Sequence, residues 1–129
     1  MNRPLCRVLC VDDDADILAV VSLALRTLGG LTVLVAGSGV EALGVLKRER
    51  VDLVLLDVMM PGMDGLQTLA SIREDPLTAG LPVVLMTARV QLYEQARPPA
   101  GVHAVIAKPF DPVSLASRLQ AIWDRVEPG

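Results

Sequence analysis

Five short apolar runs, separated by stretches with helical character, constrain most strongly what this sequence can fold into. The runs are rich in Val, Ile and Leu, and most of them lack the apolar–polar alternation of a strand that faces water on one side. Such strands are buried on both faces, as in a parallel sheet whose connecting helices cover both sides. The predicted strands are Leu5–Val11, Leu31–Ala36, Asp52–Asp57, Leu81–Met86 and Val102–Ala107.

Helix start signals stand between and after these runs. Ser38 and Glu41 match a capping box at the start of the second helix. Asp111 and Pro112 supply an N-cap and a first-turn proline for the last helix. Strict alternation of strands and helices over 129 residues predicts a single α/β domain, residues 1–129, without an output domain.

The helical spacing of apolar residues predicts which side of two helices faces the core. The first helix is expected to bury a stripe made of Ile17, Val21, Ala24, Leu25 and Leu28. The last helix is expected to bury one made of Leu115, Leu119, Ile122 and Val126. A small apolar patch on the opposite side of the first helix is a candidate docking surface, and consists of Ala15, Ala19 and Leu23.

Charge and cysteine content exclude several classes of protein. The net charge of −3 argues against direct binding to nucleic acid, which requires a basic surface. No apolar run reaches the roughly 20 residues of a membrane span, and the N-terminal run is too short for a signal peptide. Cys6 and Cys10 would lie about 13 Å apart along one strand, too far for a disulfide. We therefore expect two buried thiols in a cytoplasmic protein without membrane insertion.

Polar residues gather where the predicted strands end. Four strands are followed or closed by such residues, in chain order Asp12-Asp13-Asp14, Asp57, Thr87 and Lys108. The carboxyl ends of parallel strands meet at one edge of the sheet, where ligands of open α/β sheets bind. We therefore expect these carboxylates, the hydroxyl and the ammonium group to converge, although Asp14 alone is also a suitable helix cap.

This set of groups suits phosphoryl transfer. Two carboxylates 4 Å apart repel by about 4 kcal/mol at an effective dielectric constant of about 20, and a divalent cation relieves that repulsion. Mg²⁺ prefers oxygen ligands and commonly takes one or two carboxylates together with a phosphate oxygen. Lys108 adds a positive charge and Thr87 a hydrogen-bond donor. Asp57 is then the expected nucleophile, because carboxylates form acyl phosphates.

With these residues in place, the chain resembles the response-regulator receiver family of two-component signalling, in particular its single-domain, chemotaxis-type members. The resemblance covers nearly the whole chain and rests on VLCVDDD, GVEAL, DLVLLDVMMPGMDG, LPVVLMTA and VIAKPFDP. It implies a flavodoxin-like, doubly wound sheet with strand order 2-1-3-4-5. It also implies that a histidine kinase or histidine phosphotransfer protein donates a phosphoryl group. The modified protein then switches a contact with an unknown partner, forms a homodimer, or passes the group on.

The resemblance assigns a role to each site residue. Asp57 matches the phosphoacceptor, and Asp12 and Asp13 match the acidic pair that holds Mg²⁺. Met59 matches the residue whose backbone carbonyl completes the metal's ligands. Thr87 matches the residue that supplies the switch hydroxyl. Lys108 matches the lysine that pairs with the phosphoryl group, and this lysine is usually followed by a cis proline, here Pro109.

The chain departs from the family pattern on its presumed output face. Val105 occupies a position that is often aromatic in the family, and Pro98-Pro99 are expected to end the fourth helix early. Two alternatives to a receiver stay open from the residues. One is a Mg²⁺-dependent phosphatase of the haloacid-dehalogenase type, which also uses an aspartyl phosphate. The other is a pseudo-receiver that binds partners without being phosphorylated.

Overall fold

The computed structural model of the chain describes residues 4–58, 62, 64–88 and 102–126. Within these ranges, parallel strands form one five-stranded sheet in the order β2-β1-β3-β4-β5. The strands are β1 Arg7–Val11, β2 Thr32–Ala36, β3 Leu53–Asp57, β4 Val83–Thr87 and β5 Ala104–Ala107. The predicted doubly wound α/β fold and its strand order are confirmed. Each strand lies inside its predicted range, except that β4 extends one residue further and includes Thr87.

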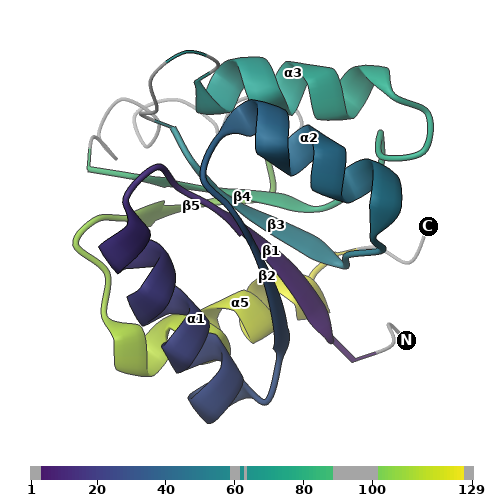
Figure 1. The fold of residues 1–129 in the computed structure, drawn as a ribbon. Coiled ribbons are helices and arrows are strands. Elements are labelled where there is room, and N and C mark those ends of the chain that lie inside the picture. Colours follow the sequence, from purple (N-terminus) through teal and green to yellow (C-terminus); the bar gives the residue numbers. More distant parts are fainter. Residues whose placement is uncertain (1–3, 59–61, 63, 89–101, 127–129) are drawn as a thin grey trace.

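Helices cover both faces of this sheet (Figure 1). Helices α1, Ala15–Gly29, and α5, Pro112–Asp124, lie on one face. Helices α2, Gly39–Arg48, and α3, Gly65–Glu74, lie on the other. None of the described helices is long and apolar enough to cross a membrane. The predicted fourth helix, and Pro98-Pro99 that are expected to end it, lie outside the described residues.

The strands lack alternation because each one feeds two cores. In β1, Val8 and Cys10 join the cluster beneath α1 and α5, whereas Leu9 and Val11 join the cluster beneath α2 and α3. Strand β3 behaves in the same way and is buried along its whole length. A strand that is buried on both faces needs apolar residues at every position. This is the physical basis of the apolar runs of β1, β3 and β4, while the edge strands β2 and β5 are only partly buried.

Side chains at the helix ends largely follow the predictions. Ser38 accepts a hydrogen bond from the Glu41 N–H, as expected for a cap. The Glu41 carboxylate, however, accepts from the Gly37 N–H, one residue before the position that a capping box requires. A complete capping box occurs at α3, between Asp64 and Gln67, where it was not predicted. At α5, the predicted N-cap is confirmed: the Asp111 side chain accepts from the Val113 N–H.

The core-facing stripes are mostly as predicted, with two corrections. Leu28 is 56% exposed, because in the last turn of α1 it is Gly29 that lies against Ala116 of α5. Cys6 is exposed rather than buried, since β1 begins one residue later and Cys6 stands at the open end of the sheet. Cys10 is buried, and burial raises the pKa of its thiol to about 12.

Asp52 has a structural role at the amino end of the sheet. It is only 3% exposed, and its carboxylate accepts hydrogen bonds from the backbone N–H groups of Cys6 (3.1 Å) and Arg7 (2.8 Å). These bonds join the start of β1 to the residue that precedes β3. A buried carboxylate is tolerated where hydrogen bonds replace the water that it loses. Asp52 therefore anchors the two central strands at the edge opposite the predicted site.

We expect His103 to make the free energy of unfolding depend on pH. Its Nδ1 accepts a hydrogen bond from the Val83 N–H at 3.4 Å. Burial, and then the positive charge of Arg73, lower the pKa of His103 from its usual 6.5. The fold therefore favours neutral His103. This stabilisation is complete above the unfolded pKa and is lost as the pH falls through the lower, folded pKa.

We expect the thermal midpoint of the wild-type protein to fall more between about pH 7 and pH 5 than that of His103→Gln, which cannot titrate. Thermal unfolding of both proteins at the two pH values measures this difference. Carboxylates titrate equally in both proteins and cancel in the comparison. Identical shifts of the two midpoints would contradict the role given to His103.

Candidate functional site

The strand order brings the predicted site residues to one place. Asp57 closes β3 and Thr87 closes the neighbouring β4. Asp12 directly follows β1 on the other side of β3, and Lys108 directly follows β5. Because β3 is the central strand, its last residue lies in the middle of the carboxyl edge. The structure thus places Asp57 between the acidic residues after β1 and the polar residues of β4 and β5.

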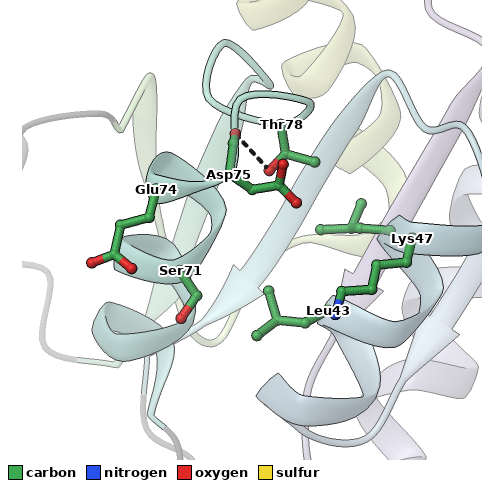
Figure 2. A pocket seen from close by; sticks show the side chains of 7 residues that line it. Leu43, Lys47, Ser71, Glu74, Asp75 and Thr78 are labelled. Carbon is green, nitrogen blue, oxygen red and sulfur yellow. Dashed lines mark hydrogen bonds between the residues drawn. The ribbon is translucent and has the colours of Figure 1, made fainter.

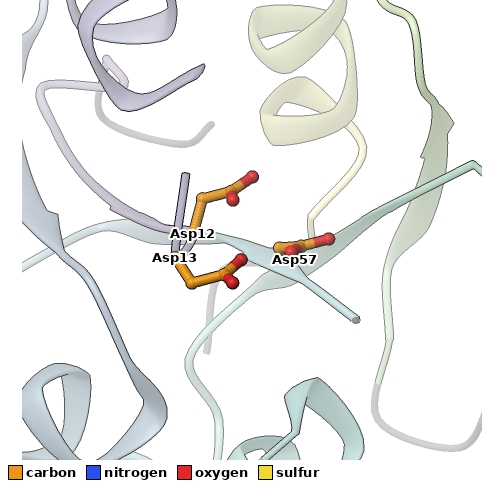
Figure 3. Close-up of side chains that lie close together, drawn as sticks. All are labelled: Asp12, Asp13 and Asp57. Atoms are coloured by element: carbon orange, nitrogen blue, oxygen red, sulfur yellow. The ribbon is translucent and has the colours of Figure 1, made fainter. Parts of the chain in front are cut away.

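Three carboxylates form a compact group at this edge (Figure 3). Asp12, Asp13 and Asp57 each offer one oxygen, and these oxygens all lie within 4.8 Å of one another. Asp12 and Asp57 are 1% and 3% exposed, whereas Asp13 is exposed. A set of hard oxygen donors at this spacing suits a hard divalent cation such as Mg²⁺. The fourth predicted ligand, the Met59 carbonyl, lies outside the described residues.

Lys108 is the positive charge of the group. Its Nζ lies 2.8 Å from the Asp12 carboxylate and 3.1 Å from the Asp57 carboxylate. Burial alone lowers the pKa of Lys108, but the hydrogen bonds to Asp12 and Asp57 and their charges outweigh it and raise the pKa above its usual 10.5. Lys108 is therefore an ammonium group at neutral pH. The contact with Asp12 was not predicted from the sequence.

Local hydrogen bonds show that the three acidic residues after β1, Asp12, Asp13 and Asp14, have different roles. Asp12 accepts from the Asp14 N–H at 2.9 Å, which fixes the turn. Asp14 caps α1 by accepting from the N–H groups of Asp16 (2.9 Å) and Ile17 (3.3 Å), as predicted. Asp13 lies between these two residues and is exposed. It is thus placed to bind an ion from the solvent side.

Thr87 is 1% exposed at the end of β4, beside the Asp57 strand. Its carbonyl oxygen accepts a hydrogen bond from the Lys108 N–H at 2.9 Å, so the backbone joins the two residues directly. The Lys108–Pro109 peptide bond is cis, as the sequence resemblance implied. Val105 is half-buried in β5, opposite Leu85 of β4.

Comparison with known proteins identifies a family model, related sequences and solved structures that resemble this chain. Residues 8–120 match the family model described as the response regulator receiver domain. The chain is 38% identical over 123 residues to chemotaxis protein CheY-3 of Vibrio cholerae, and the match covers 93% of both proteins. The solved structure of CheY4 from Vibrio cholerae has a TM-score of 0.83 at 29% identity, covering 92% of this chain and 98% of that one.

A longer relative is the DNA-binding response regulator MtrA of Mycolicibacterium paratuberculosis. It is 37% identical over 116 residues, which is 89% of this chain and 50% of MtrA. The chain therefore spans about half the length of that relative.

The crowding of the three carboxylates generates a prediction with two readouts. Removing the Asp13 carboxylate takes away a metal ligand and also relieves repulsion with Asp12 and Asp57. We expect Asp13→Ala to unfold at a higher temperature than the wild type in chelator, by about 1 kcal/mol in free energy of unfolding. The same variant should lose the stabilisation that added Mg²⁺ gives the wild type.

Thermal unfolding with EDTA and across a Mg²⁺ titration measures both effects. Glu74→Ala is the matched control, because it removes an exposed carboxylate at the end of α3 (Figure 2), far from this edge. It should change neither the stability in EDTA nor the stabilisation by Mg²⁺. If Mg²⁺ raises the thermal midpoint of Asp13→Ala as much as it raises that of the wild type, this set of ligands is wrong.

Proposed function

The chain belongs to the response-regulator receiver family, and on that premise we propose that Asp57 accepts a phosphoryl group from a histidine kinase or a histidine phosphotransfer protein. The observation that carries this proposal is the position of the Asp57 carboxylate. It is buried at the centre of the edge, 3.1 Å from the Lys108 Nζ and within the acidic group. The module acts by signalling rather than by turnover of a substrate.

The transfer step follows from these contacts. An oxygen of the Asp57 carboxylate attacks the phosphorus of a phosphohistidine. The new P–O bond forms as the P–N bond breaks, and the electron pair of that bond stays on the leaving imidazole. Asp12, Asp13, Asp57 and the backbone carbonyl of Met59 would hold Mg²⁺, and the bound ion would supply positive charge that neutralises the phosphoryl oxygens. Lys108 supplies the second positive charge, and because its pKa is raised it keeps that charge throughout.

Phosphorylation changes the partners available to Lys108. Its ammonium group now bridges Asp12 and Asp57, and the phosphoryl oxygens on Asp57 offer it a third anionic partner. Thr87, whose backbone carbonyl is bound by the Lys108 N–H, adds a hydroxyl that donates to a phosphoryl oxygen. Phosphorylation thereby shifts the equilibrium between two conformations of the segments that follow β4 and β5. The altered surface then binds a downstream protein or a second copy.

The phosphodonor docks on α1. The three residues of the predicted patch, Ala15, Ala19 and Leu23, line one groove between α1 and the edge strand β2. Leu23 is 67% exposed and Val35 of β2, which also lines the groove, is 43% exposed. The groove starts at the residue after the Asp14 cap and so adjoins the acidic edge. A donor that covers it brings its own side chains close to Asp57.

We expect Asp57→Asn to abolish phosphorylation while keeping the fold, because the amide has the shape of the carboxylate but is not a nucleophile. Incubation with acetyl phosphate and Mg²⁺ followed by intact mass should show one hydroxylamine-sensitive phosphate on the wild type and none on the variant. Continued release of inorganic phosphate would instead indicate a phosphatase, and an unlabelled wild type would indicate a pseudo-receiver. Undiminished labelling of the variant would exclude Asp57 as the acceptor.

We expect Leu23→Glu to slow phosphoryl transfer from a histidine kinase that labels the wild type by about fivefold or more, because a charge enters an apolar contact. Labelling by acetyl phosphate should be unchanged, since the chemistry lies elsewhere. Leu77→Glu is the matched control: Leu77 is 92% exposed in the turn after α3, away from the groove. Equal loss with both donors, or equal loss in the two variants, would contradict docking on α1.

A further inference from the structure

The first residue of α3 lies directly against the end of the Asp57 strand. The Gly65 N–H donates a hydrogen bond to the Val58 carbonyl oxygen at 3.0 Å. A Cβ atom added at Gly65 would lie 2.4 Å from the Asp57 carbonyl oxygen and 2.7 Å from the Val58 Cα. Real Cβ atoms essentially never approach other atoms closer than 3.0 Å, so a side chain here forces something to move.

The atoms that a side chain would meet cannot rotate away. Both belong to the backbone of the central strand and the residue after it. Gly44 in α2 is a useful contrast, because a Cβ there would meet only the end of the flexible Arg48 side chain, at 3.4 Å. The close approach at Gly65 is thus a property of that position rather than of helical glycines in general.

Buried side chains and a backbone bond keep α3 against the sheet. Leu69 and Ile72, both buried, pack in the core between α3 and the sheet, and the Gly65 N–H is bonded to the Val58 carbonyl. The first turn is also braced internally, by the capping box of Asp64 and Gln67 (two hydrogen bonds of 2.9 Å) and by the bond from the Thr68 hydroxyl to the Asp64 carbonyl at 3.0 Å. A side chain at Gly65 therefore displaces the Asp57–Val58 peptide.

We propose that Gly65 is a positioning residue for the phosphoryl site: its missing side chain lets α3 set the Asp57–Val58 peptide so that the Asp57 carboxylate meets Lys108 and the acidic pair. This inference rests on the proposed function of Asp57. The affected geometry is tight, since the carboxylate is 3.1 Å from the Lys108 Nζ and within 4.8 Å of its acidic neighbours. A misplacement of about 1 Å at such a site costs on the order of 100-fold in rate.

The test compares Gly65→Ala with two control variants whose effects on stability are expected from their positions. Ile72→Val loosens the packing of α3 and adds no atom near Asp57, so it reports what a loss of stability alone does. Gly44→Ala controls for the exchange of a helical glycine and should raise stability slightly. For each protein we would measure the thermal midpoint, the affinity for Mg²⁺ alone by calorimetry, and the rate of labelling by acetyl phosphate.

We expect Gly65→Ala to label about 10- to 100-fold more slowly and to bind Mg²⁺ at least several-fold more weakly. Ile72→Val and Gly44→Ala should stay within about twofold of the wild type in both measurements. Values for Gly65→Ala that match those of Ile72→Val would overturn the proposal, because the role of Gly65 would then be stability alone. If the wild type is not labelled at all, the proposed function fails, and the Mg²⁺ affinities still decide the role of Gly65.

If Gly65→Ala is unfolded under the assay conditions, trimethylamine N-oxide, which favours the folded state, would be added. All four proteins would then be measured in the same solution. A variant that stays unfolded there would assign Gly65 to folding, and would also overturn the proposal.

Discussion

One lysine shared between two buried carboxylates is the interaction on which the site depends. A parallel sheet brings the ends of all its strands to one edge, and here three of those ends carry charge. Removing Asp12 and Asp57 from water is costly unless each finds a partner, and the Lys108 Nζ serves both. With Asp13 beside them, the group still holds more negative than positive charge. The group therefore suits a divalent cation, and in the function proposed above a phosphoryl group exchanges for one of the existing ion pairs.

The two ends of β3 show how the same residue type takes different roles. Asp52 precedes the strand and Asp57 closes it, and both are 3% exposed. Asp52 accepts hydrogen bonds from the backbone N–H groups of Cys6 and of Arg7, the first residue of β1. Asp57 lies 3.1 Å from the Lys108 ammonium group, a side-chain partner that also contacts Asp12. Asp52 thus serves the backbone of the sheet, whereas Asp57 belongs to a cluster of charged side chains.

The sequence predicted the parts of this arrangement that depend on local pattern. Val8 to Val11 are apolar without alternation, and that alone indicated a strand with two covered faces. The position of Asp57 after such a run, with Asp12 and Lys108 after two others, was enough to predict a shared edge. The capping box of Asp64 and Gln67 was not predicted, although an N-cap residue three positions before a glutamine is a local pattern that the sequence does contain.

Other features depend on distances across the fold that no local pattern encodes. The bonds from Cys6 and Arg7 to Asp52 span more than forty residues of chain. The contact of Lys108 with Asp12 and the close approach of Gly65 to the Asp57 backbone likewise appear only when strands and helices are packed. Leu28 was misplaced because Gly29, and not a larger residue, fills the contact with α5.

The most direct test of the account is chemical identification of the phosphorylated residue. Borohydride reduces an aspartyl phosphate to homoserine, so the protein would be labelled with acetyl phosphate and Mg²⁺, reduced, digested and sequenced by mass spectrometry. We expect homoserine at position 57 and unchanged aspartate at positions 12 and 13. Homoserine at position 12 or 13, or a phosphate on a side chain away from this edge, would contradict it.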